Sequence, residues 1–219
     1  MGDISESIYE ILRCAHRDSE PEFALRLRET MVAEHAAMAD DDSCPMKPAR
    51  ILADVRKVMG REDILVSDVG AHKMWIARHY DCYTPNTCLI SNGFAAWAFP
   101  FRVPLPQSSS TQIKKVLAVC GDGGFMMNSQ ELETAVREKV PFVTLIWEDS
   151  SYGLIKWKEQ EQFGGEHCYV DFTNPDFKML AEAMHCKGYR VEKAEDLIPT
   201  LEEAFRQDVP VYRGACGLQ

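Results

Sequence analysis

The sequence contains no pair of cysteines with C-x-x-C spacing, no uninterrupted run of 18 apolar residues, and no excess of basic residues. The eight cysteines are therefore expected to be reduced structural thiols of a cytoplasmic protein, and not ligands of zinc. Without a long apolar run, we expect no transmembrane helix. Lysine and arginine number 24 against 34 aspartates and glutamates, a net charge of −10 that argues against binding to nucleic acid or a membrane surface.

The composition of the chain is that of a globular protein. Of its 219 residues, 46% are hydrophobic and 26% are charged, which are ordinary values. A chain of this length buries about 70% of its unfolded surface, so it needs neither disulfides nor a metal to fold. An acidic, proline-terminated segment, residues 40–45, has the composition of a linker. We expect residues 1–44 to be the tail of a preceding domain and residues 45–219 to form one domain.

Three short apolar runs, residues 64–66, 115–120 and 142–147, predict buried strands of a parallel sheet. The predicted helices are residues 3–13, 22–38, 48–59, 72–80, 127–138, 175–185 and 194–206. This alternation predicts an α/β fold with a doubly wound, mainly parallel sheet and helices on both faces. Residues 97–112 do not fit the pattern, because three prolines within them exclude both a helix and a central strand.

The segment that carries chemistry is Gly121-Asp122-Gly123-Gly124, between a predicted strand and a predicted helix. Glycines at such a junction let the backbone approach a phosphate, which the free N–H groups of a helix start favour. An aspartate there would repel the phosphate unless a cation lay between them, and Mg²⁺ suits that position. Asp149 ends the next predicted strand and supplies a second carboxylate at the same edge of the sheet. The alternative is a tight turn in which Asp122 only caps the helix.

The spacing of these acids, with the residues that follow them, resembles the cofactor motif of thiamine-diphosphate enzymes. The matching residues are Gly121, Asp122, Gly123, Gly124, Glu148, Asp149, Ser151, Tyr152 and Gly153. The resemblance implies thiamine diphosphate and Mg²⁺ as cofactors, and Asp122, Asp149 and the backbone carbonyl of Ser151 as ligands of the metal. Glu148 replaces the asparagine that is usual in the family, at a position that does not bind the metal.

Residues 46–96 and 113–210 look like the last domain of acetolactate synthases and their close relatives. The match implies one loop that contacts the diphosphate and a second group near the junction of the two cofactor rings. The loop is Val69, Gly70, Ala71 and His72, and the second group is Ser91, Asn92 and Gly93. With Gly121–Gly124 and Ser151–Gly153, these are the expected cofactor-binding residues, and no residue is expected to act as a catalytic acid or base.

The resemblance stops at two places. Trp97 stands where the family carries a methionine that supports the cofactor, and it opens the irregular segment 97–112. Residues 212–219 do not continue as the apolar strand found in the family. Degenerate codons for both segments, read one base out of phase, give a glycine- and alanine-rich helix and a strand end of the family type. We therefore interpret both segments as products of compensating frameshifts.

The resemblance implies the acetolactate synthase reaction, in which two molecules of pyruvate, a small 2-keto acid, give 2-acetolactate and CO₂. In that family the cofactor lies between two domains, and a separate N-terminal pyrimidine-binding domain of the same or another subunit supplies an activating glutamate. No part of the sequence resembles that domain, and residues 1–44 look like the end of the middle domain. We expect a fragment that is inactive alone and whose full-length enzyme is a homo-oligomer.

Three other interpretations of the motif are compatible with the sequence. Other thiamine-diphosphate-dependent 2-keto acid decarboxylases and ligases share the motif. A catalytically dead remnant and a phosphate-binding module without catalysis would also contain a glycine-rich loop after a strand.

Overall fold

The computed structural model describes residues 3–15, 21–93, 97, 114–207 and 211–216. The chain divides into two compact units, residues 1–37 and 38–219. The first unit contains α1 (Ile4–Cys14) and most of α2 (Glu22–Met38), as the sequence predicts, and neither helix has a buried residue. Among the described helices, none combines the length and the apolar character needed to cross a membrane.

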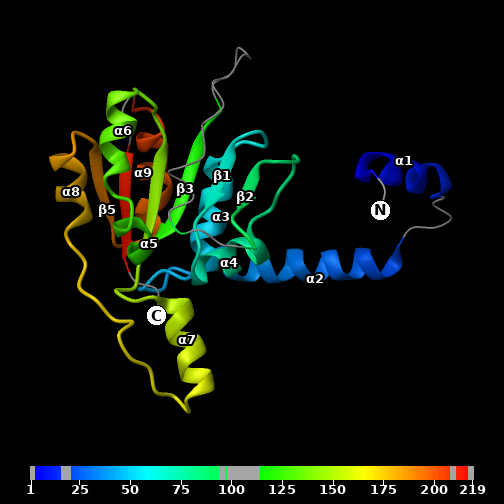
Figure 1. Ribbon diagram of the computed structural model, residues 1–219, viewed down its shortest axis with the longest axis horizontal. Helices are drawn as coiled ribbons and strands as arrows, with labels where there is room; N and C mark the ends of the chain where they lie inside the picture. Colours follow the sequence, from blue (N-terminus) through cyan, green and yellow to red (C-terminus); the bar gives the residue numbers. More distant parts are fainter. Residues whose placement is uncertain (1–2, 16–20, 94–96, 98–113, 208–210, 217–219) are drawn as a thin grey trace. The chain divides into compact units, whose positions relative to one another are not determined.

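The second unit is built on a six-stranded parallel sheet of order β2-β1-β3-β4-β6-β5 (Figure 1). The strands are β1 (Ile64–Ser67), β2 (Cys88–Ile90), β3 (Val116–Gly121), β4 (Val143–Glu148), β5 (Lys187–Val191) and β6 (Val211–Cys216). The three predicted strands are confirmed as β1, β3 and β4. The chain passes from β2 back across β1 to β3, so the strand order reverses between β1 and β3, where parallel α/β sheets bind ligands.

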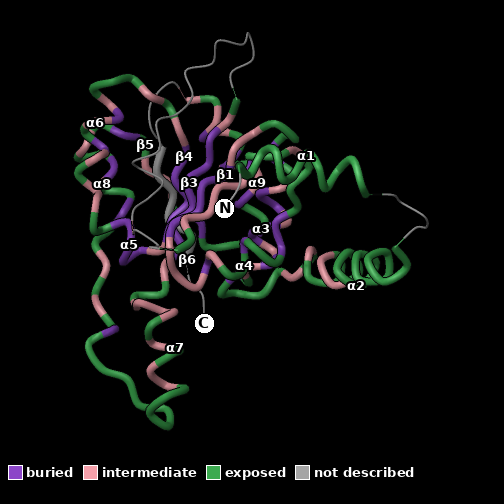
Figure 2. Tube along the Cα trace, turned by 45° about the vertical axis from the view of Figure 1, so that its right-hand side comes forward, coloured by how far each residue is buried: buried purple, intermediate pink, exposed green. Residues whose placement is uncertain are grey.

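Helices cover both faces of this sheet, which confirms the doubly wound fold. One face packs against α3 (Pro48–Val58), α4 (Ala71–His79), the 3₁₀ turn η2 (Ala194–Asp196) and α9 (Leu197–Ala204). The other face packs against α5 (Asp122–Met126), α6 (Glu131–Arg137) and α8 (Phe177–Ala183). Neighbouring residues of β4 alternate, with Leu145 and Trp147 in one core and Ile146 in the other. Figure 2 shows the buried residues concentrated along β1, β3 and β4.

The prediction of one helix over 127–138 is wrong in detail. α5 begins at Asp122, directly after β3, and α6 follows at Glu131 after a turn. The N–H groups of Met127 and Asn128 donate to carbonyls only three residues earlier, at 3.3 and 3.2 Å, so the first helix tightens and ends there. The glycine motif is thus the first turn of a helix and not a loop before one.

Residues 212–216, whose sequence departs from the apolar strand found in the family, lie in a strand, β6. β6 lies between β4 and β5 and pairs in parallel with both, with Gly214 opposite Ile146 on one side and Arg190 on the other. Backbone hydrogen bonds to two partners hold such a strand, so an apolar run is not required. Residues 98–112 and 217–219 lie outside the described residues.

One further helix, α7 (Gly153–Gln162), follows β4 and extends from the carboxyl edge of the sheet (Figure 1). It has no buried residue. The sequence gives no sign of it, because its mixed charged and apolar residues lack a clear helical period.

Candidate functional site

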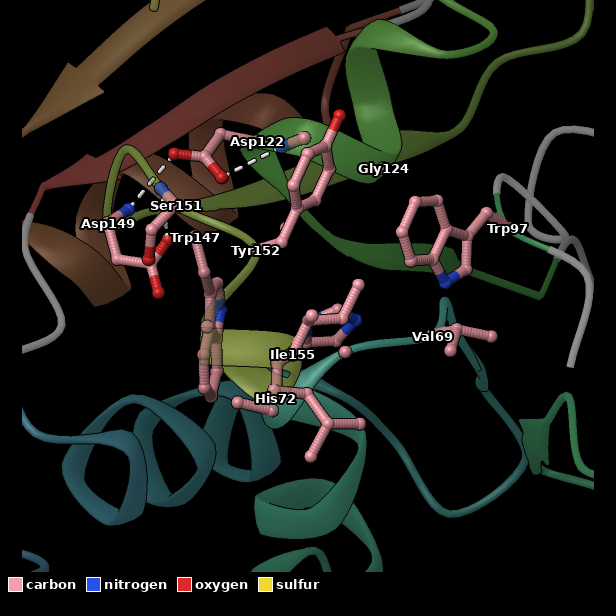
Figure 3. A pocket seen from close by; sticks show the side chains of 16 residues that line it. Val69, His72, Trp97, Asp122, Gly124, Trp147, Asp149, Ser151, Tyr152 and Ile155 are labelled. Atoms are coloured by element: carbon pink, nitrogen blue, oxygen red, sulfur yellow. Dashed lines mark hydrogen bonds between the residues drawn. The ribbon is translucent and has the colours of Figure 1, made fainter. Parts of the chain in front are cut away.

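A pocket of about 80 Å³ lies where β1, β3 and β4 end. Most of the residues predicted to bind the cofactor or the metal line it, and they are Val69, Gly70, Ala71, His72, Gly121, Asp122, Gly123, Gly124, Asp149, Ser151, Tyr152 and Gly153. Trp97, Trp147, Leu154 and Ile155 complete the lining. Figure 3 shows Asp122, Asp149 and Ser151 at one end of the pocket, with His72 and Ile155 away from them.

The Asp122 side chain is buried at the acidic end of the pocket, with 1% of the residue exposed. Its Oδ2 accepts the backbone N–H groups of Asp149 at 3.0 Å and Ser150 at 2.7 Å, and its Oδ1 accepts that of Gly123 at 2.8 Å. Gly121 occupies the cap position of α5, so the alternative reading of Asp122 as a helix cap is wrong. The carboxylate instead joins the end of β3 to the loop after β4.

The Asp149 carboxylate lies at the same end of the pocket. Its Oδ1 accepts the Ser151 N–H at 3.0 Å, and a Cβ on Gly153 would lie 2.7 Å from its Oδ2. Burial, and then the negative charge of Asp122, raise the pKa of Asp149 to about 6. Two carboxylates that repel one another in a partly buried site are the oxygen set that a divalent cation neutralises.

These residues fit a magnesium ion. The described residues include no group of three or more His, Cys, Asp and Glu side chains that could hold a metal. Mg²⁺ does not require such a group, because it commonly binds one or two carboxylates and takes its other oxygens from water, backbone and substrate phosphates. A third protein ligand here would be a backbone oxygen, and Ser151 lies in the lining beside both acids.

The glycines of the motif are required by close packing. A Cβ on Gly123 would lie 2.5 Å from Tyr152 Cε1 and 3.0 Å from Phe172 Cζ. A Cβ on Gly124 would overlap the carboxylate of Asp68, which is fully buried. The short helix α5 can therefore press against the pocket wall only because these two positions lack side chains.

His72 lies in the pocket as a neutral imidazole at pH 7. It is 4% exposed, and burial lowers its pKa to about 4 in spite of a hydrogen bond to the Asp68 backbone. Its Nε2 is buried and has no hydrogen-bond partner among the described residues. Gly70 precedes it with φ +152°, and a Cβ there would lie 2.8 Å from His72 Cε1. His72 can thus offer a ligand a hydrogen bond but not a positive charge.

Aromatic rings form another wall of the pocket. Trp97 stacks on Tyr152, with ring centroids 5.3 Å apart, and Tyr152 packs against Phe172 at 4.9 Å. Trp147 meets His72 edge to face at 6.2 Å. The lining roles of Trp147 and Ile155 were not predicted, although Trp147 immediately precedes the Glu148-Asp149 pair at the end of β4.

The structure does not bring Ser91, Asn92 and Gly93 into this pocket. They follow β2, which is separated from β3 by β1, and they are absent from the lining. They still lie beyond the carboxyl end of a parallel strand, at the same edge of the sheet as the pocket. Ligand pockets commonly measure about 300–1,000 Å³, so a volume of about 80 Å³ holds only part of a cofactor-sized ligand.

A family model described as the C-terminal TPP-binding domain of thiamine pyrophosphate enzymes matches residues 68–212. An acetolactate synthase of Bacillus subtilis is 29% identical over 215 residues, which are 96% of this chain and 38% of the relative. A catabolic acetolactate synthase of Raoultella terrigena is 35% identical over 171 residues, 75% of this chain and 29% of the relative. The chain therefore spans about a third of the length of these relatives.

Among solved structures, a thiamine diphosphate-dependent 4-hydroxybenzoylformate decarboxylase of Rhodococcus jostii has a TM-score of 0.70 and 22% identity. The match covers 78% of this chain and 32% of that chain. At this identity the likeness concerns the fold.

Proposed function

The chain belongs to the thiamine pyrophosphate enzymes, whose C-terminal cofactor-binding domain it contains, and on this premise we propose that the pocket binds the diphosphate of thiamine diphosphate through Mg²⁺. Asp122, Asp149 and the Ser151 carbonyl are the proposed ligands of the metal. The observation that carries the proposal is the hydrogen bond of 3.0 Å from the Asp149 backbone N–H to the Asp122 carboxylate, which joins Asp122 to the loop of Asp149.

The other pocket residues have proposed roles toward the same cofactor. Neutral His72 has one ring N–H, which its hydrogen bond to the Asp68 backbone uses, so its unpartnered Nε2 would accept a hydrogen bond on the cofactor side of the pocket. The loop Val69–Ala71 and the turn Ser151–Gly153 would enclose the diphosphate from two sides. Ser91, Asn92 and Gly93 would lie beyond it, toward the cofactor rings. The bound cofactor supplies the electron sink for decarboxylation of a 2-keto acid.

Calorimetric titration of the full chain with thiamine diphosphate tests this site. Binding is expected in the presence of Mg²⁺ and not in EDTA. Asp122→Ala and Asp149→Ala each remove one oxygen ligand of the metal, so both are expected to weaken binding at least tenfold. Asp196→Ala, in the remote 3₁₀ turn, is the matched control. Equal binding with and without Mg²⁺ would contradict the assignment.

A second domain is proposed to complete the pocket. A groove of about 380 Å³ between α4 and α7 shares Ala71, Gly153 and Leu154 with the site, and Met74, Trp75 and Trp157 in it are 41–49% exposed. Exposed apolar surface of this kind marks an interface. The proposed occupant is an N-terminal pyrimidine-binding domain of the same or another subunit in a homo-oligomer, and without it the chain is expected to be inactive.

Association with the separately produced N-terminal domain of the Bacillus subtilis relative tests this part. Trp157→Glu places a charge in the groove and is expected to abolish association. Phe163→Glu is the matched control, since Phe163 is 64% exposed and is not part of the groove lining. Association that survives Trp157→Glu would place the interface elsewhere.

The proposed reaction of the completed enzyme is condensation of two pyruvates to 2-acetolactate and CO₂. Its support is the similarity to acetolactate synthases over most of the chain. The second candidate is decarboxylation of another 2-keto acid, supported only at the level of the fold. Product analysis of the reconstituted enzyme with pyruvate and, separately, with an aromatic 2-keto acid separates them, because acetolactate from pyruvate supports the first candidate and a free aldehyde from the aromatic 2-keto acid supports the second.

A further inference from the structure

The two oxygens of the Asp122 carboxylate have unequal surroundings. Oδ2 accepts three N–H groups, from the Asp149 backbone, the Ser150 backbone and the Asn174 side chain, at 3.0, 2.7 and 2.7 Å. From the residues that the structure describes, Oδ1 accepts only the Gly123 N–H, at 2.8 Å. A carboxylate oxygen has about two lone-pair sites, so Oδ2 is saturated and Oδ1 keeps capacity for another ligand.

Asn174 is the only side-chain donor to Asp122 within the described part of the chain, and it comes from 52 residues further along. The segment before it is fastened to the loop after β4. The Tyr152 N–H donates to the Val170 carbonyl at 2.9 Å, and the Phe172 N–H donates to the Ser150 carbonyl at 3.0 Å. These backbone bonds bring Asn174 within hydrogen-bond distance of Asp122, and Asn174 is not part of the pocket lining.

The orientation of the Asn174 amide follows from its neighbours. Its Nδ2 donates to Asp122 Oδ2 at 2.7 Å and to Ser150 Oγ at 3.4 Å. A flipped amide would set two oxygens against each other, so Asp122 fixes the orientation. The Asn174 Oδ1 is then buried with no hydrogen-bond partner among the described residues, an arrangement that lowers stability. An asparagine whose side-chain oxygen is buried without a hydrogen bond contributes little to the stability of the fold. The role that remains for Asn174 is its hydrogen bond to Asp122.

We propose that Asn174 is a positioning residue for the metal site. Its N–H, with those of Asp149 and Ser150, holds Asp122 Oδ2 and turns Oδ1 toward the cation. The inference rests on the proposed function, because it assumes that Asp122 binds the metal. Outer hydrogen bonds to metal ligands typically contribute 10–100-fold to metal affinity.

The test is Mn²⁺ binding by the full chain with thiamine diphosphate, measured by the electron paramagnetic resonance signal of free Mn²⁺. Asn174→Leu has a similar size and no donor, and is expected to weaken Mn²⁺ binding about 10-fold or more while the melting temperature of the metal-free protein stays the same or rises. Asn174→Ala is the second variant, in case leucine does not fit. Asn128→Ala, which loses an ordinary side-chain hydrogen bond to Gln130, is the matched control.

The outcomes distinguish a failure of the proposed function from a failure of the inference about Asn174. If the unaltered chain does not bind Mn²⁺, the proposed function fails and the inference fails with it. If the unaltered chain binds Mn²⁺ and the Asn174 variants bind it within twofold, only the inference is overturned. A lower melting temperature with unchanged Mn²⁺ affinity would show that Asn174 is structural, and would also overturn it.

Discussion

Trp97 stacks on Tyr152 with ring centroids 5.3 Å apart and ring planes 18° apart. The contact joins two distant parts of the chain, one beyond β2 and one at the start of α7. Tyr152 in turn lies over Gly123, where a Cβ would come within 2.5 Å of its ring. An aromatic stack thus closes one side of the pocket over the first turn of α5.

The stack is expected to contribute to cofactor binding. An aromatic pair contributes about 0.5–1.5 kcal/mol beyond its buried area, so Trp97→Ala should weaken thiamine diphosphate binding about 2–10-fold in calorimetric titration. Trp97→Met, which keeps an apolar side chain over Tyr152, should weaken it less. Phe163→Ala, outside the pocket, serves as the control. Unchanged affinity in Trp97→Ala would show that the stack does not shape the site.

Gly123→Ala should destabilise the domain although alanine is the better helix former. The gain in helix propensity is about 1 kcal/mol, whereas overpacking against the ring of Tyr152 costs about 1–3 kcal/mol. We expect a net loss of up to about 2 kcal/mol in urea unfolding. Tyr152→Ser removes the ring, so the same glycine substitution made in that background should be neutral or stabilising. A loss of the same size in both backgrounds would show that the Tyr152 contact is not the cause.

The buried His72 predicts a loss of stability in acid. Burial lowers its pKa in the folded state from the ordinary value of 6.5, which the unfolded chain retains, to about 4. The unfolded chain therefore binds more protons between these two values. The contribution of His72 to stability is complete above pH 6.5 and is lost as the pH falls toward 4. Between pH 7 and pH 5 the loss is about 2 kcal/mol.

Urea unfolding at the two pH values measures this term. His72→Gln cannot take up a proton and should lose about 2 kcal/mol less than the unaltered chain over that interval. His185→Asn changes an exposed histidine and should follow the unaltered chain. The same pH dependence in His72→Gln would mean that other groups cause the acid loss.

The sequence predicts the parts of the fold whose signal is local. β1, β3 and β4 are continuous apolar runs because both of their faces are buried. β6 contains Tyr212, Arg213 and Gly214 and reads as no strand, since its place between β4 and β5 depends on pairing with distant segments.

The same limit applies to the site. The acids Asp122 and Asp149 follow from their positions at strand ends, whereas the contact of Asn174 with Asp122 spans 52 residues and has no local signal. Trp147 and Ile155 line the pocket because of the way in which β4 and α7 are arranged around it. This arrangement produces no periodic pattern in the sequence. The start of α5 at Asp122 was missed because glycines normally disfavour a helix.

The most direct measurement of the central claim is a crystal structure of the chain with thiamine diphosphate and Mn²⁺, with diffraction recorded at the manganese absorption edge. The account predicts one anomalous peak bound by the Asp122 and Asp149 carboxylates and the Ser151 carbonyl, at metal–oxygen distances of about 2.1 Å. It also predicts that Asp122 uses Oδ1 for this bond, while Oδ2 keeps its three N–H donors. A diphosphate bound without a peak between these two aspartates, or a peak elsewhere in the chain, would contradict the account.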